Sequence, residues 1–147
     1  MRVREDGVTL IELMTALVVL AILASIAVPS YRSYLLRSQR ADAKTALLQL
    51  QAAQEKFYLQ NNRYTDKIAD PSPGGLGLTA KSAHGFYDIA VDLRIPGNED
   101  SDQGYTATAT PAPGGGQQDD TKCTSLTLTD RGERDATPSG SRDYCWR

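Results

Sequence analysis

Hydrophobic and polar residues divide the chain into an apolar run, an amphipathic stretch and several short alternating segments. The 21 residues from Val8 to Val28 hold a single charge, at Glu12. In a helix rising about 1.5 Å per residue they would extend about 31 Å, which matches the hydrocarbon core of one bilayer. The pattern therefore predicts a membrane-spanning helix near the N-terminus.

Helical spacing continues beyond Pro29, which predicts a kink near the outer membrane face and not the end of the helix. One face of the next stretch carries Leu36, Ala43, Leu47, Leu50 and Phe57 at spacings of three, four and seven. The opposite face carries Arg37, Arg40, Lys44, Gln51 and Glu55. This amphipathic pattern predicts a helix from about Thr9 to Gln60 whose second half packs on a sheet.

Strand patterns follow a turn-rich connector at residues 70–77 (DPSPGGLG). Apolar and polar residues alternate in Phe86–Ile95, Gly104–Thr110 and Ser125–Thr129, so we predict three half-buried antiparallel strands, with a flexible loop at Pro111–Gly116. We expect Tyr144–Trp146 to form a short extended segment at the end of the chain.

Composition limits the classes of function. The chain has 147 residues, enough for one globular domain, and a formal net charge of −2. It is therefore neither a polybasic nucleic-acid binder nor an acidic tail protein.

Cys123 and Cys145 are the two cysteines of the chain. They lack the Cys-x-x-Cys or histidine partners of a zinc site, so we expect no bound metal. If this part lies outside the cytoplasm, a disulfide would close a loop of about 22 residues and contribute roughly 3 kcal/mol. Two unpaired buried thiols in a cytosolic protein are the alternative.

Three interpretations compete for the N-terminal run. A secretory signal would use the small-x-small sequence Ser25-Ile26-Ala27, but such signals have 7 to 15 apolar residues and no acid. A plain single-pass anchor explains the length. It gives no purpose to Glu12, although a carboxylate at the centre of a bilayer costs about 2 to 3 kcal/mol.

The third interpretation depends on a resemblance. The stretch Gly7-Val8-Thr9-Leu10-Ile11-Glu12-Leu13 resembles the class III signal of type IV prepilins. This resemblance implies that residues 1–7 are a leader, that a prepilin peptidase cleaves between Gly7 and Val8, and that Val8 is then N-methylated. Glu12 would be fifth in the mature chain, and Pro29 would be the family's helix-kinking proline at position 22. The family usually has phenylalanine where this chain has Val8.

Glu12 would then act in assembly. Its charge is costly in lipid, and the terminal ammonium of Val8 in a neighbouring subunit would neutralise it when two such helices pack. We hypothesise that this pair sets the axial register of a filament. Arginines flank the run on both sides, so the positive-inside rule does not decide topology. The short leader and the cysteine pair place the N-terminus in the cytoplasm.

A second resemblance covers the rest of the chain. The segments Phe86-Tyr87-Asp88-Ile89, Tyr105–Ala109, Asp119-Asp120 before Cys123, Leu126–Leu128 with Gly132, and Cys145-Trp146 resemble PilE-type minor pilins of type IVa systems. This implies an α+β type IV pilin fold, in which a long N-terminal helix packs on a four-stranded antiparallel sheet with a C-terminal disulfide-bounded loop, the D-region. The expected divisions are 1–7 leader, 8–29 transmembrane and filament-core helix, 30–62 amphipathic half, 63–84 αβ loop, and 85–147 sheet and D-region.

Catalytic and ligand motifs are weak. His84 has no nucleophile motif nearby, and Gly114–Gly116 lacks the lysine and helix of a phosphate loop. The acidic stretch Asn98–Gly104 fails the EF-hand spacing, although an irregular calcium loop stays open as an alternative. We therefore expect no enzyme activity and no cofactor.

A nucleic-acid partner is not indicated by the C-terminal charges. Arg131, Arg134, Arg142 and Arg147 are balanced by Asp130, Glu133, Asp135 and Asp143. No basic stripe results. Trp146, beside a cysteine, is expected to pack and not to serve as a stacking platform.

The resemblances together imply a structural subunit of a type IV pilus, a minor one, which resides in the inner membrane before assembly and in the surface pilus afterwards. Implied partners are prepilin peptidase, a major pilin, other minor pilins, an inner-membrane platform and motor ATPases, with twitching motility and adhesion as outputs. The alternatives are a type II secretion pseudopilin and a DNA-binding or surface-binding pilin of a competence system.

Overall fold

The computed structural model describes residues 8–93 and 102–147. It divides into two compact units, residues 1–35 and 36–147. Helix α1 (Leu10–Asn61) has 52 residues and contains Pro29. The prediction of one helix from about Thr9 to Gln60 is therefore confirmed, while the kink at Pro29 stays a prediction.

The described part of the first unit, residues 8–35, has no core of its own. Every residue from 8 to 35 is exposed, including large apolar side chains such as Leu10 at 76% and Leu20 at 62%. By length and composition α1 could cross a membrane, since its most apolar 18-residue window has a mean hydropathy of 2.5 and is 0% buried. Apolar side chains in this number need lipid or other apolar helices to cover them.

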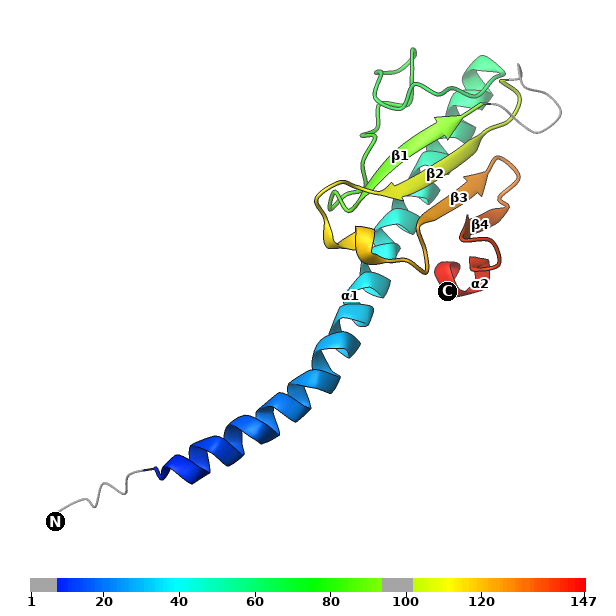
Figure 1. Ribbon diagram of the computed structural model, residues 1–147. Coiled ribbons are helices and arrows are strands. Elements are labelled where there is room, and N and C mark those ends of the chain that lie inside the picture. The colour runs from blue at the N-terminus through cyan, green and yellow to red at the C-terminus, as the bar shows by residue number, and fades with distance from the viewer. Residues whose placement is uncertain (1–7, 94–101) are drawn as a thin grey trace. The chain divides into compact units, whose positions relative to one another are not determined.

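The second unit is built on a four-stranded antiparallel sheet in the order β1-β2-β3-β4 (Figure 1). Its strands are β1 (Tyr87–Asp92), β2 (Thr106–Pro111), β3 (Ser125–Thr129) and β4 (Arg134–Thr137). The first three lie where alternation predicted strands, and the α+β fold with a four-stranded sheet is confirmed. The expected end of the first strand, Arg94–Ile95, lies outside the described residues.

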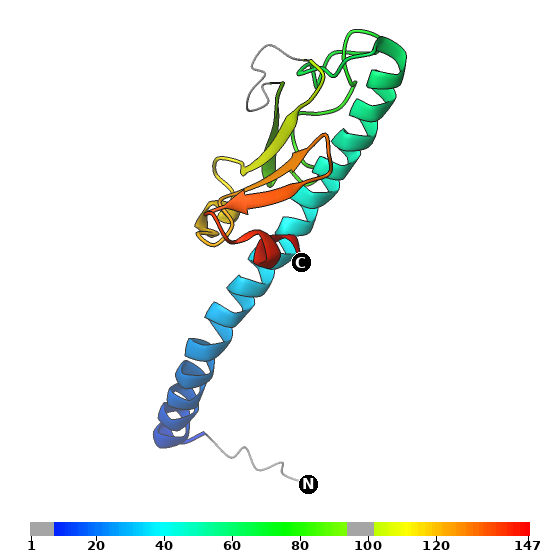
Figure 2. The same ribbon diagram turned by 90° about the vertical axis from the view of Figure 1, so that its right-hand side faces the viewer.

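The second half of α1 covers one face of this sheet (Figure 2). Ala43, Leu47 and Leu50 are at most 1% exposed and join one cluster with the inward residues of the strands. Those inward residues are Tyr87, Ile89, Ala107, Ala109, Leu126, Leu128 and Ala136. Burying a leucine of this kind contributes roughly 1.5–3 kcal/mol, so this seam is a main source of stability for the unit.

Arg40 corrects the predicted polar face of the helix. It is 3% exposed, and its Nε and Nη2 donate to Asp120 Oδ2 at 2.6 Å and Oδ1 at 2.8 Å. Arg40 lies three residues before Ala43 and seven before Leu47, on the buried stripe. The sequence pattern did not indicate that Arg40 is buried, because arginine is almost never buried unless it is paired.

Gln54 is a second polar residue on the buried stripe of α1. Its side chain is 0% exposed, donates to Thr65 O at 2.5 Å and accepts from Thr65 N at 3.1 Å. The amide thus replaces the backbone partners that Thr65 lacks outside regular structure. This pair fastens the loop after α1 to the helix.

The C-terminal part confirms the disulfide and corrects the predicted extended segment. Cys123 and Cys145 are bonded, with Cα atoms 5.8 Å apart, but residues Arg142–Trp146 form a short helix, α2. Cys145 N donates to Ser141 O at 2.9 Å. The disulfide fixes one point of this segment, and none of the four described strands pairs with it, so its backbone forms hydrogen bonds locally.

The predicted flexible loop at Pro111–Gly116 is also partly wrong. Pro111 is the last residue of β2, and Gly116 begins a short 3-10 helix, η1 (Gly116–Asp119). This turn leads to Asp120, the partner of Arg40, which lies three residues before Cys123 at the start of the disulfide-bounded D-region.

Candidate functional site

Glu12 and Thr9 form a reciprocal set of hydrogen bonds at the start of α1. Glu12 Oε2 accepts from Thr9 N at 3.0 Å and from Thr9 Oγ1 at 2.7 Å, and Glu12 N donates to Thr9 Oγ1 at 3.4 Å. This is a capping box, in which a threonine and a glutamate three residues later satisfy the first free N–H groups of a helix. The Thr-x-x-Glu spacing signals such a box in the sequence, and the box gives Glu12 a role within its own helix, while the pairing with Val8 of a neighbour stays a prediction.

The other residues of the expected processing and assembly site lie around this box. Val8 precedes α1 and is 69% exposed, and Pro29 lies inside the helix. Gly7 lies outside the described residues. Both the cleavage between Gly7 and Val8 and the methylation of Val8 stay predictions.

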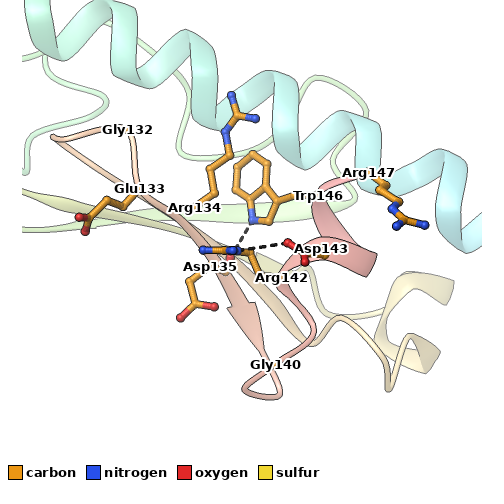
Figure 3. A pocket seen from close by; sticks show the side chains of 9 residues that line it. All are labelled: Gly132, Glu133, Arg134, Asp135, Gly140, Arg142, Asp143, Trp146 and Arg147. Carbon is orange, nitrogen blue, oxygen red and sulfur yellow. Dashed lines mark hydrogen bonds and ion pairs between the residues drawn. The ribbon is translucent and has the colours of Figure 1, made fainter.

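An open groove lies between the β3–β4 turn and α2 (Figure 3). Trp146 lines it and is partly buried against the core, so it packs as expected. Its indole Nε1 donates to Asp135 O at 2.8 Å, and the guanidinium of Arg134 lies over its ring, 5.2 Å from the centroid. We call this surface the Trp146 groove.

Charges in the Trp146 groove balance. Arg142 Nε lies 3.3 Å from Asp143 Oδ1 in an exposed ion pair, and Glu133 and Asp135 lie on the same lining as Arg134 and Arg147. This agrees with the balance of four arginines and four acids predicted from the sequence. The groove offers no net charge to a polyanion.

Cations from α1 contact the segment of α2 and its end, at Tyr144 and at Arg147. The Arg40 guanidinium lies 4.8 Å from the centroid of the Tyr144 ring, and Lys122 Nζ lies 5.5 Å from it. Lys44 Nζ donates to the backbone oxygen of Arg147. The tertiary structure thus adds cations from the helix to a segment whose own charges cancel.

The pKa values of Tyr144 and Lys44 are both lowered by positive charges around them. A hydrogen bond with Arg40, together with the charges of Arg40, Lys122 and Arg37, lowers the pKa of the Tyr144 phenol. Partial burial and the positive charges of Arg40 and Arg134 lower the pKa of Lys44. Both shifts are those expected where positive charges are concentrated.

His84 lies in an exposed loop, as predicted, and contacts a carboxylate on α1. Its Nδ1 lies 3.0 Å from Asp42 Oδ1, and its ring is 73% exposed. Burial alone would raise the pKa of Asp42, but hydrogen bonds from Ser82 and His84 outweigh burial and lower it. The contact ties the loop to the helix and provides no nucleophile.

Within residues 8–93 and 102–147, no group of three or more histidine, cysteine, aspartate or glutamate side chains could hold a metal ion. Most of the acidic stretch Asn98–Gly104, which left a calcium loop open, lies outside those residues. Gly114 has a φ of +82° and lies in the turn before η1, without the following long helix of a phosphate loop.

Two family models match this sequence. Residues 2–28 match the prokaryotic N-terminal methylation motif. Residues 29–127 match the model described as type IV minor pilin ComP, DNA uptake sequence receptor. The second match alone covers more than half of the chain and ends before the first residue that lines the Trp146 groove.

Curated relatives include both pilins and a secretion protein. The type IV major pilin protein PilA of Myxococcus xanthus (strain DK1622) is 36% identical over 100 residues, covering 63% of this chain and 46% of that protein. The type II secretion system core protein G of Pectobacterium carotovorum subsp. carotovorum is 36% identical over 61 residues, covering 42% of this chain and 39% of that protein. The matches span 46–66% of the length of the first curated relatives.

Among solved structures, a type IV pilin from Shewanella oneidensis matches with a TM-score of 0.45 and 21% sequence identity. The match covers 71% of this chain and 93% of that chain.

Proposed function

Since this chain belongs to the type IV pilin family, we propose that it is a structural subunit of a type IV pilus, present as a minor component. The observation that carries the proposal is the methylation motif over residues 2–28, joined to an apolar helix whose side chains are all exposed from 8 to 35. Minor status is supported by the description of the family that matches residues 29–127.

Processing is the first step of the proposed function. A prepilin peptidase removes residues 1–7 by cleaving after Gly7, and the new terminal amine of Val8 is methylated. Val8 lies outside α1 and is exposed, so it is accessible at the start of the helix.

As a type IV pilin with an apolar N-terminal helix, the chain is anchored in the inner membrane before it enters the surface pilus. Assembly partners follow from this in general terms. As specific partners we propose prepilin peptidase, a major pilin, other minor pilins, the inner-membrane platform and the pilus motor ATPases, with twitching motility and adhesion as outputs.

The mass of the mature protein tests the proposal. We expect intact mass spectrometry of the protein from sheared pili to show loss of residues 1–7, one added methyl group on Val8 and two hydrogens missing at the cysteines. Its amount should be well below that of the major subunit. An untrimmed N-terminus, or cleavage after Ala27, would contradict the proposed processing, and equal abundance would contradict minor status.

Recruitment to a secretion apparatus is the rival within the same superfamily. The match to the secretion core protein covers 42% of this chain, whereas the pilin family model covers residues 29–127. The disulfide near the C-terminus also favours a pilus subunit over a pseudopilin. Recovery of the protein in sheared pili distinguishes the two.

DNA binding is a second candidate function, favoured by the matching family's description as a DNA uptake sequence receptor. We expect the full mature chain in non-ionic detergent to bind labelled duplex DNA in an anisotropy assay at about 50 mM salt. Because phosphate contacts release counterions, the affinity should fall steeply as salt rises. Absence of binding at low salt would remove this candidate and leave the pilus role intact.

A further inference from the structure

Three tyrosine rings contact one another at the C-terminal end of α1. Tyr58 lies in the last turn of the helix, and the centroid of its ring is 4.7 Å from that of Tyr64, with 31° between the ring planes. Tyr64 also contacts Tyr105, whose ring centroid is 4.9 Å away at an angle of 68°. The proposed role in a pilus assigns no task to these rings.

Access to solvent distinguishes the two pairs of rings. Tyr58 and Tyr64 are half-buried, so part of each side chain can meet a dissolved reagent. Tyr105 is fully buried, and its hydroxyl lies in the protein interior. A small oxidant therefore reaches the Tyr58–Tyr64 pair, whereas Tyr105 packs against Tyr64 from the inner side.

The hydroxyl groups of both accessible tyrosines have acceptors. Tyr64 Oη donates to Glu55 Oε1 at 3.2 Å, and Tyr58 Oη donates to Gln103 Oε1 at 3.1 Å. Burial, together with the charge of Glu55, raises the pKa of Tyr64 to about 12, so this phenol keeps its proton at neutral pH. Loss of an electron from Tyr64 is then coupled to loss of the proton, and the Glu55 carboxylate is placed to accept it.

We propose that Tyr58 and Tyr64 are an oxidation site, at which one-electron oxidants derived from peroxides join the two rings by a carbon–carbon bond. Each phenol loses one electron to the oxidant and one proton, which passes from Tyr64 to Glu55 and from Tyr58 to water. The two phenoxyl radicals couple at ring carbons next to the oxygen-bearing carbons. The hydrogens of those two carbons then move to the oxygens as protons and restore both rings. Two tyrosines and one hydrogen peroxide thus give one cross-link and two water molecules.

Contact between the rings favours this product. Two reactive groups held side by side do not need to meet by diffusion, which is a large advantage over coupling between separate chains. Tyr64 follows α1 and belongs to no helix or strand, so its ring can turn to bonding distance without moving one. The disulfide of the same unit is typical of oxidising compartments, where such oxidants occur. The cross-link fastens the end of α1 to the loop that follows it.

The test oxidises the full mature chain in non-ionic detergent with persulfate, a peroxide, and a light-activated ruthenium complex, and digests the monomer with trypsin. Cleavage after Lys56, Arg63 and Lys67 places Tyr58 alone in the peptide 57–63 and Tyr64 alone in the peptide 64–67. We expect these peptides to be joined, with a mass two hydrogens below their sum. Fragmentation of the joined peptides locates the bond without any variant.

Variants identify the two rings and the proton acceptor. Tyr58→Phe should abolish the joined peptides, while Tyr34→Phe, the same change at an exposed position of the same helix, should leave them unchanged. Glu55→Gln should slow their formation about tenfold or more, because it removes the base. Asp66→Asn, at an exposed acid of the following loop, should not slow it.

Two results would overturn the proposal. One is oxidation that joins separate chains through the exposed Tyr31, Tyr34 or Tyr144 and leaves the peptides 57–63 and 64–67 unlinked. The other is absence of the joined peptides under conditions in which free tyrosine is coupled in a parallel sample. An unchanged rate in Glu55→Gln would overturn the role of Glu55 as proton acceptor.

Discussion

Replacing Asp120 with alanine will lower the free energy of unfolding of the second unit by about 3–5 kcal/mol. The change leaves the Arg40 guanidinium buried at 3% exposure without its partner, and an uncompensated buried charge is among the costliest single defects. Because Asp120 lies three residues before Cys123, where the disulfide-bounded segment begins, we also expect that segment to separate from α1. Denaturant unfolding followed by Trp146 fluorescence reports on this unit alone.

Two matched variants show whether buried charge is the cause. Lys81→Ala breaks the ion pair between Lys81 and Asp88, in which the two side chains are 60% and 38% exposed. Because this pair is exposed, the change should lower the free energy of unfolding by less than about 1 kcal/mol. The double change Arg40→Met with Asp120→Leu removes both charges and should recover much of the stability lost by Asp120→Ala. If Asp120→Ala is no worse than Lys81→Ala, the pair is not a main support of this unit.

Replacing Glu12 with glutamine will prevent incorporation of the subunit into pili. Glutamine keeps the capping box with Thr9, since it also accepts from the first free N–H groups, but it carries no charge to attract the amine of Val8 in a neighbour. The Glu12–Val8 pair removes a penalty of about 2–3 kcal/mol that the carboxylate carries in lipid. This free energy corresponds to a change of roughly 30- to 150-fold in the equilibrium for incorporation of the subunit. Immunoblots of sheared pili against cell membranes measure the incorporated fraction.

Thr9→Ala separates the capping of α1 from the predicted pairing of Glu12 with Val8 of a neighbouring subunit. It removes the N-cap hydroxyl, which costs about 0.5–2 kcal/mol of helix stability, and leaves the charge of Glu12. We expect this variant to enter pili nearly as well as the unmodified chain. If Thr9→Ala fails to enter pili while Glu12→Gln enters them, Glu12 acts by starting the helix. The hypothesis that Glu12 pairs with Val8 of a neighbouring subunit is then wrong.

The long helix and three of the strands were predictable because their periodicity is strong. The stripe of Ala43, Leu47 and Leu50 repeats at helical spacing, and Ala107 and Ala109 alternate with threonines at strand spacing. Both patterns reflect burial of one face, and the structure buries those faces. The disulfide followed from the cysteine count once the C-terminal part was placed outside the cytoplasm.

Short elements were not predictable in the same way. β4 (RDAT) contains one apolar residue and is extended because β3 offers it a partner, with Leu126 opposite Ala136. α2 was expected to be extended, and its five residues carry too little pattern to reveal a helix. In both cases the surroundings decide the backbone conformation.

The sequence by itself determined the apolar N-terminal helix, the amphipathic packing face and the processing motif, because each is written in neighbouring residues. Only the tertiary structure decided where charge lies. It buried Arg40 against Asp120, 80 residues away, and placed Arg40 and Lys122 beside the ring of Tyr144. Electrostatic energy depends on distance in space and on access to water, and a count of charges along the chain contains neither.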